Sequence, residues 1–171
     1  MTRRPTAAEL QGLWHLNSLM PQEDVLFTQT YVSPGQGPDG KPLCTAMVAM
    51  LTASHESFSD MHGLPTDEIW HFYLGDPIEL LLLHPDGRDE LVILGADVLN
   101  GQRIQTVVPN GTWMGARLRP GGEYGVYGNT MAPGFVPNDF DPANADELIE
   151  RWPHRAELIT ALTRTPTTDR A

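Results

Sequence analysis

Residues 78–94 read IELLLLHPDGRDELVIL, in which two apolar runs, 78–84 and 90–94, flank a short polar turn. The pair Asp86-Gly87 lies in that turn. An Asx-Gly pair between two short apolar runs is a strong signal for a β-hairpin, because both residues tolerate the positive φ angles that tight hairpin turns require. This stretch therefore predicts two antiparallel strands.

The same alternation of short runs and turns continues on both sides of this hairpin. The other runs rich in β-forming residues cover 27–33, 43–52, 68–73, 104–108, 113–118 and 123–130, and turn pairs at 100–101, 110–111 and 121–122 join several of them. Many short strands at this spacing are typical of an antiparallel sandwich or barrel, and the joints are too short for the crossover helices of a parallel sheet. We expect an all-β fold, an antiparallel β-barrel or jelly roll.

Helical patterns flank the strands at both ends of the sequence. A capping-box pattern, Thr-Ala-Ala-Glu, precedes apolar residues at helical spacing and predicts a helix over 6–20. A second pattern of this kind predicts C-terminal helices over about 144–163. The expected organisation is one domain over 1–171, with a barrel core over about 26–136 and peripheral helices.

The composition narrows the classes of function. The chain has 11 Lys and Arg against 22 Asp and Glu, a formal net charge of −11, which argues against binding to a nucleic-acid backbone. No apolar run approaches the roughly 20 residues of a membrane helix, and no apolar segment typical of a signal peptide follows the basic start. A single cysteine excludes an internal disulfide framework. We expect a cytoplasmic enzyme or small-ligand binder, with neither nucleic acid nor membrane as partner.

The stretch 57–75, SFSDMHGLPTDEIWHFYLG, is the richest in groups that carry chemistry. His and Glu side chains are metal ligands and also general acids and bases. Side chains alternate between the two faces of a strand, so Glu68 and Trp70 share one face while His71 and Tyr73 occupy the other. A metal site made jointly by Glu68 and His71 is therefore not expected from one regular strand.

The order of these residues resembles the cupin superfamily. Its first motif runs Gly, His-x-His, Glu, Gly, and six residues separate Glu68 from Gly75 as that motif requires. His62 stands where the second His would come, and Asp60 replaces the first. In the second motif, Pro-x-Gly followed by His, residues 109–111 match and a methionine occupies the His position. The resemblance implies a cupin β-barrel.

The sequence is most similar to a cupin branch often described as sugar-epimerase-like, and the similarity extends over about 10–162. The segments that carry it are TYVS at 30–33, His62 followed by DEIWHFYLG at 67–75, LG at 94–95, VPNGTW at 108–113, APGF at 132–135 and DF at 139–140. This resemblance implies a homodimer. The branch usually carries a His-Pro-Glu-Gly-Gly-like segment and then Arg-Glu-Thr, where this chain has MPQEDV at 20–25 and TQT at 28–30, retaining Glu23. A different substrate or reaction from the relatives is therefore expected.

Three residues are the catalytic candidates. His62 coincides with the cupin motif and is a candidate pocket base or metal ligand, against the alternative of a hydrogen-bonded loop histidine. Glu68 is a candidate acid partner or ligand, against a strand-end carboxylate paired with arginine. Tyr73 is a candidate for orienting a ligand, against a role in packing or at an interface.

Three further residues are the ligand-binding candidates, namely Thr45, Gln29 and Trp113. The alternative for Trp113 is packing in the core. The cupin pattern supplies three His and one Glu to a metal, and only His62 and Glu68 remain here, so we expect no cofactor and at most a weakly held divalent metal at those two residues.

The resemblance and the candidate residues together favour an enzyme. We expect a small-molecule isomerase, epimerase or lyase that uses His62 and Glu68 for acid–base chemistry on a small polar or carbohydrate-like substrate, with specialised metabolism as the setting. One alternative is a ligand-binding cupin without catalysis. A weaker alternative is a metal-dependent cupin oxygenase.

Overall fold

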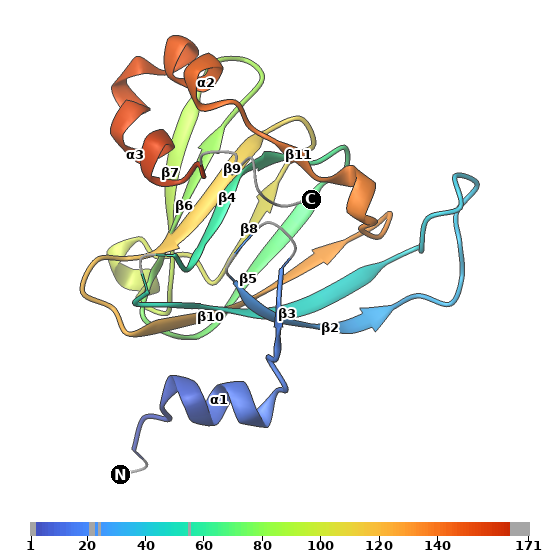
Figure 1. The fold of residues 1–171 in the computed structure, drawn as a ribbon, viewed down its shortest axis with the longest axis vertical. Coiled ribbons are helices and arrows are strands. Elements are labelled where there is room, and N and C mark those ends of the chain that lie inside the picture. Colours follow the sequence, from blue (N-terminus) through green and yellow to red (C-terminus); the bar gives the residue numbers. More distant parts are fainter. Residues whose placement is uncertain (1–2, 21–22, 24, 55, 165–171) are drawn as a thin grey trace.

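Two antiparallel sheets face one another in the computed structural model, which describes residues 3–20, 23, 25–54 and 56–164 (Figure 1). The first sheet runs in the order β1 (Ser18–Leu19), β2 (Leu26–Val32), β3 (Thr45–Thr52), β10 (Tyr124–Met131), β5 (Glu68–Gly75) and β8 (Gln105–Val108). The second runs in the order β11 (Asp141–Pro142), β4 (Phe58–Gly63), β9 (Trp113–Leu118), β6 (Ile78–Leu83) and β7 (Asp89–Leu94). The predicted all-β fold, an antiparallel barrel of jelly-roll type with peripheral helices, is confirmed.

The predicted hairpin at 78–94 is present as β6 and β7. The two strands pair along their whole length, and the His84 amide donates to the Arg88 carbonyl at 2.8 Å to close the turn. Gly87 has a φ of 90°, a left-handed conformation. The Asp-Gly pair was interpreted as a turn because its residues tolerate such an angle. The strand predicted over 113–118 has those bounds as β9, and the other predicted strands shift by a few residues at their ends.

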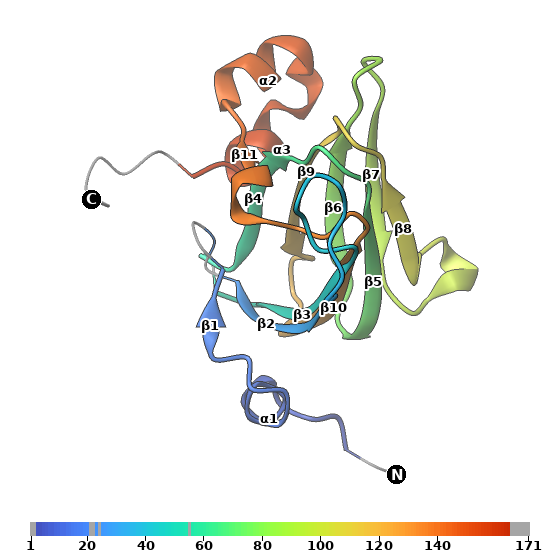
Figure 2. The ribbon, with the colours of Figure 1, turned by 90° about the vertical axis from the view of Figure 1, so that its right-hand side faces the viewer.

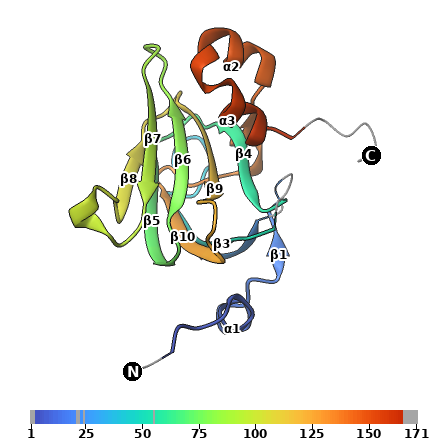
Figure 3. The same ribbon diagram turned by 90° about the vertical axis from the view of Figure 1, so that its left-hand side faces the viewer.

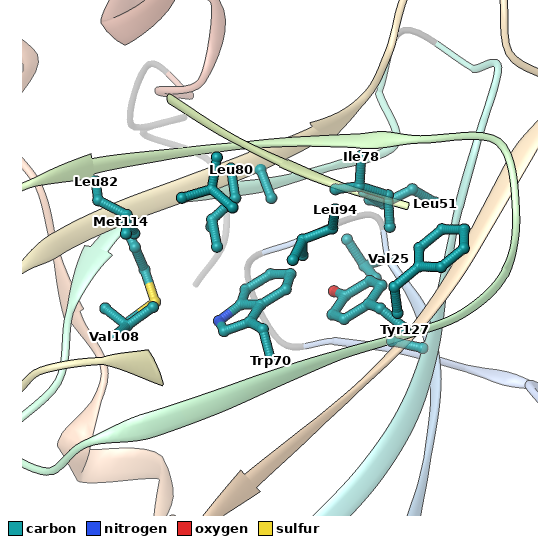
Figure 4. Close-up of a cluster of buried hydrophobic side chains, with 14 of the residues drawn as sticks. Val25, Leu51, Trp70, Ile78, Leu80, Leu82, Leu94, Val108, Met114 and Tyr127 are labelled. Atoms are coloured by element: carbon teal, nitrogen blue, oxygen red, sulfur yellow. The ribbon is translucent and has the colours of Figure 1, made fainter. Parts of the chain in front are cut away.

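The core between the sheets is apolar and built from alternate residues of each strand. Figure 4 shows Trp70 of β5 and Tyr127 of β10 pointing across this space toward Leu80 and Ile78 of β6. The rings of Trp70 and Tyr127 stack with centroids 4.6 Å apart and planes 8° apart. Stacked aromatic pairs of this kind stabilise a core beyond the area that they bury.

The helices cover the outer faces of the sheets (Figures 2 and 3). Leu81 and Leu83 of β6 point away from the barrel and pack with Trp152 and other apolar residues of the C-terminal helices. Both faces of β6 are therefore buried, which explains its unbroken run of leucines. Those helices are α2 (Ala145–Arg151) and α3 (Ala156–Ala161), with the short 3₁₀ helix η3 (Pro153–Arg155) between them. The remaining 3₁₀ turns are η1 (Val98–Asn100) and η2 (Pro137–Asp139).

The N-terminal helix is shorter than predicted. The predicted capping box is present, and α1 (Ala7–Leu13) begins after Thr6, but the helix ends at Leu13 rather than at residue 20. His15 has a φ of 53°, which turns the chain so that Leu16 is buried against β3 and β10 before β1 begins. Tertiary burial of Leu16 and pairing of β1 with β2 thus override the helical spacing. Pro21, the residue after the predicted end of the helix, lies outside the described residues.

Strand β4 was not among the strands predicted from the sequence. Its pairing with β9 shifts register between Ser59 and His62, a β-bulge that breaks the two-residue alternation. Ser59 and His62 consequently face the same side of the strand, while Met61 packs with the C-terminal helices. The Met61 amide donates to the Leu162 carbonyl at 2.7 Å, and its carbonyl accepts from the Ala143 amide at 2.9 Å.

None of the helices in the described part of the chain is long and apolar enough to cross a membrane.

Candidate functional site

A cavity of about 420 Å³ lies between the two sheets. Side chains of β2, β3, β5 and β10 line one wall, and side chains of β4 and of the segment around η2 line the other. Its lining is mostly apolar, and the polar side chains among it are Glu23, Gln29, Thr45, Ser59, His62, Glu68, Tyr127 and Asn129. A concave, apolar pocket with a few converging polar groups is the usual form of a small-molecule site.

The ring of His62 is fixed in position by two contacts. Its Nδ1 lies 2.7 Å from the Asp60 carbonyl oxygen, and its ring stacks on Phe140 with centroids 4.7 Å apart. A carbonyl oxygen only accepts, so Nδ1 carries the hydrogen and Nε2 of the neutral ring is left as an acceptor. Burial lowers the pKa of His62 to about 4, which keeps the ring neutral at pH 7.

Glu23 is the carboxyl group beside His62. Its Oε1 accepts from Ser59 Oγ and from the Asp60 amide, each at 2.9 Å, and lies 3.8 Å from His62 Nδ1. Burial raises the pKa of Glu23 to about 8, and these two hydrogen bonds offset only part of that rise. The carboxyl group is therefore mostly protonated at pH 7, with the proton on Oε2, since Oε1 already accepts two hydrogen bonds.

Glu68 enters the cavity from the opposite sheet. As the alternation predicts, Glu68 and Trp70 share the inner face of β5, and the Trp70 indole donates to Glu68 Oε2 at 2.6 Å. Burial raises the pKa of Glu68 to about 7, against the lowering effect of the Trp70 N–H. Burial and the neighbouring carboxylates raise the pKa of Tyr127 as well, so its hydroxyl stays protonated.

Asn129 of β10 lies close to Glu68 in the same wall. The side chain is 4% exposed, and neither its amide nitrogen nor its amide oxygen bonds any described residue. A hydrogen-bonding contribution from Asn129 lowers the pKa of Glu68, but the contact between the two side chains does not reach the distance and angle of a hydrogen bond. A buried amide without partners is costly, so its presence here calls for an explanation.

The structure brings four of the six predicted site residues together. His62, Glu68, Thr45 and Gln29 line the cavity, where the Thr45 hydroxyl accepts from the Phe135 amide at 2.9 Å and exposed Gln29 lies at the mouth. Tyr73 lies, as the alternation predicts, on the face of β5 opposite to Glu68, where it is 49% exposed, so its candidate role of orienting a ligand in the cavity is corrected.

The predicted placement of Trp113 is corrected for a similar reason. It packs in the cluster beneath the C-terminal helices, close to Gly63, and does not line the cavity. Its alternative interpretation as a packing residue is the correct one. Sequence analysis did not propose Glu23, Ser59 or Asn129 as site residues. For Glu23 a signal existed, since it is the one acid retained from the segment of the relatives.

Comparison with known proteins identifies the family. The profile of the family described as "Cupin superfamily (DUF985)" matches residues 13–143. The chain belongs to the cupin superfamily. No curated protein matches this cupin.

Solved structures agree with the barrel. This cupin is similar to a protein from Shewanella oneidensis at 24% identity and a TM-score of 0.83, covering 94% of this chain and 99% of that one. It is similar to a protein from Leishmania major at 24% identity and a TM-score of 0.81, covering 94% and 100%. A cupin 2 conserved barrel domain protein from Rhodopseudomonas palustris matches at 15% identity and a TM-score of 0.56, covering 84% and 81%. At these identities the likeness establishes the fold alone.

Among the described residues of this cupin, no side chains assemble a typical metal centre. Over the described ranges, no three His, Cys, Asp or Glu side chains gather closely enough to hold a metal ion. Asp60, in the place of a cupin histidine, accepts from the Arg164 amide at 2.8 Å and does not line the cavity. His71, on the outer face of β5, contacts Thr130 and Gln105 instead. We derive no step through a metal, and weak metal binding at His62 and Glu68 stays a prediction.

Proposed function

We propose that this cupin is an isomerase or epimerase that moves a proton at a carbon next to the carbonyl group of a small polar or carbohydrate-like molecule. A lyase that begins with the same proton abstraction belongs to the same proposal. The observation that carries it is that His62 on β4 and Glu68 on β5 line one cavity from two facing sheets.

Inversion at a carbon needs a base on one face of the planar intermediate and an acid on the other. A ligand between the sheets meets His62 from one side and Glu68 from the other. At pH 7 the neutral ring of His62 accepts a proton, while Glu68, with a pKa of about 7, is present in both its forms. Proton transfer is most efficient when the pKa of the catalytic group lies near the working pH.

Glu23 supports the transfer by compensating charge. In the molecules whose Glu23 has already released its proton to solvent, a minority at pH 7 because its pKa is about 8, a carboxylate lies 3.8 Å from Nδ1 of His62. When Nε2 of His62 takes the proton of the substrate in these molecules, the imidazolium forms beside that negative charge. Such compensation favours the imidazolium in a buried site, where an isolated charge is disfavoured.

A ligand-binding cupin without catalysis is the second candidate. The largely apolar lining favours it, because such walls retain a ligand without any need for proton transfer. The homodimer implied by the resemblance stays a prediction and does not bear on either candidate.

The test follows hydrogen exchange rather than a named product. Single enantiomers of chiral, uncharged α-hydroxy ketones are incubated with the protein in D₂O, and nuclear magnetic resonance records loss of the C–H signal next to the carbonyl and the appearance of the other enantiomer. The proposal expects inversion with incorporation of deuterium. His62→Gln and Glu68→Gln each abolish inversion, but each still permits exchange from the one enantiomer whose C–H faces the remaining group.

Tyr73→Phe is the matched control, because Tyr73 lies on the same strand as Glu68 but outside the cavity. It leaves exchange and inversion unchanged. Binding of these ketones with no exchange above that of buffer contradicts the proposal and favours the second candidate.

A further inference from the structure

Asn129 is the one buried polar side chain of the cavity wall whose two amide atoms both lack a partner among the described residues. Its neighbours across the ladders are Met47 on β3 and Trp70 on β5, so the strand hydrogen bonds around it are already made. The side chain lies on the inner face, 4% exposed, among the apolar residues of the wall.

An unpaired buried amide loses its hydrogen bonds to water and gains none in return. A ligand that fills the cavity restores both, if it presents an acceptor to the NH₂ group and a donor to the oxygen of the same amide. The observation therefore points to a ligand with a hydrogen-bond donor next to an acceptor along one edge.

The charges of the lining restrict the ligand further. The described residues that line the cavity include the acids Glu23 and Glu68, with no Lys or Arg among them. An anionic ligand would lose its hydration without gaining a cation, which costs several kcal/mol in a buried site. The apolar lining, with Phe27 and Phe135 among it, favours a ligand with an apolar body over one hydroxylated all round.

We propose that the cavity takes an uncharged molecule with an apolar body and one edge on which a donor lies beside a carbonyl acceptor, and that Asn129 holds this edge. Carboxamides and α-hydroxy carbonyl compounds share this edge. The inference rests on the proposed function only in that both place a carbonyl compound in the same cavity. It narrows the substrate class and excludes carboxylates and phosphate esters.

Four small aromatic probes of similar size test the edge and the charge. Benzamide and 2-hydroxyacetophenone are neutral and carry a donor beside a carbonyl, acetophenone lacks the donor, and benzoate carries a negative charge. Dissociation constants come from chemical-shift titration of the protein at pH 7. We expect at least one of the first two to bind about tenfold tighter than both acetophenone and benzoate. The tighter binder of these two shows whether the cavity prefers the edge of a carboxamide or that of an α-hydroxy carbonyl compound.

The variant Asn129→Leu tests the assigned residue. It reduces the preference of the better neutral probe over acetophenone to less than about threefold, because the pairing groups are gone. Thr130→Val is the control, since Thr130 follows on the same strand but contacts His71 outside the cavity, and it keeps the preference. Asn129→Asp, which retains the shape but loses the donor, serves as a second variant, and the comparison of probes on the unchanged protein needs no variant.

The inference is overturned if benzoate binds tighter than both benzamide and 2-hydroxyacetophenone. It is also overturned if acetophenone binds as tightly as the better of those two. Failure of this inference and of the proposed function are separable. Selective binding of benzamide or 2-hydroxyacetophenone, with no α-hydrogen exchange in 2-hydroxyacetophenone or in the chiral hydroxy ketones, contradicts the function and supports the inference. Inversion of an anionic substrate supports the proposed function and contradicts the inference.

Discussion

Oε1 of Glu23 lies 3.8 Å from Nδ1 of His62, although the two residues come from distant parts of the sequence. Both also depend on Asp60, whose carbonyl oxygen accepts from the imidazole and whose amide donates to the carboxyl group. One peptide segment of β4 therefore sets the position of an acid and of a base together. The pair acts as a unit, and changes to either partner should be visible in the other.

The first prediction removes the titration of Glu23 while keeping its shape. In Glu23→Gln, the amide oxygen can accept from Ser59 and Asp60 as the carboxyl oxygen does. We expect α-hydrogen exchange to fall by about tenfold to a hundredfold, because the imidazolium loses its compensating charge. The melting temperature should change little below pH 4.5, where Glu23 is protonated in the folded and in the unfolded chain, and should rise at pH 7, because the variant no longer takes up a proton on folding. Undiminished exchange in a folded variant would remove Glu23 from the mechanism.

The second prediction concerns stability against pH. The folded-state pKa of Glu23, about 8, and that of Glu68, about 7, both lie above the ordinary value of 4.5. The folded protein therefore holds these protons where the unfolded chain releases them, so their stabilising effect is lost as pH rises from 4.5 toward 8.

His62 acts in the opposite direction, because its pKa falls from 6.5 to about 4 on folding and its contribution grows with pH over that interval. We expect the melting temperature to fall most steeply between about pH 6 and 7, where both carboxyl groups still hold protons that the unfolded chain has released and the offset from His62 is ending. Above pH 7 only Glu23 continues the fall. Glu23→Gln combined with Glu68→Gln should flatten this part of the curve. Calorimetry at several pH values would check it, and an equally steep curve for the double variant would contradict it.

The third prediction is that a substitution in the wall of the cavity stabilises the protein. Asn129→Leu replaces an unpaired buried amide by an apolar group next to an open cavity. We expect the free energy of unfolding to rise by about 1 kcal/mol or more, because the cost of the unpaired amide disappears. Denaturant unfolding measures the change. A destabilised variant would mean that Asn129 is paired in the free protein.

The fourth prediction exposes the imidazole to water. Phe140 stacks on the ring of His62 at 4.7 Å, and burial is the cause of the low pKa. Phe140→Ala should raise the pKa of His62 from about 4 toward its ordinary value of 6.5. Titration of the histidine ring signals by nuclear magnetic resonance follows the shift, with His71 on the outer face as an internal reference. An unchanged value would show that other residues keep water away.

The strand pattern and the turns were predictable because they depend on local chemistry. The hairpin at 78–94 needed only its Asp-Gly turn and its apolar runs, and the shared face of Glu68 and Trp70 needed only the alternation of a regular strand. The same alternation already separated Glu68 from His71 and Tyr73, and the structure extends that separation to the site.

The rest depends on features that a single sequence does not display. The bulge in β4 places Ser59 and His62 on one face, although their spacing in a regular strand would divide them. The proximity of Glu23 to His62 depends on how the segment before β2 lies against β4, which is a tertiary property. The helix predicted over 6–20 ends early because burial of Leu16 outweighs local propensity.

The hydrogen bonds of Met61 couple the end of the chain to the site. The backbone of Met61, directly before His62, is hydrogen-bonded to Leu162 on one side and to Ala143 on the other. The position of the imidazole therefore depends on the end of the last helix. Loosening of that helix, by a nick or by a lost apolar contact, would misdirect the ring while the remaining strands keep their pairing. The geometry of the cavity can therefore be lost through a change well away from it, before the protein denatures.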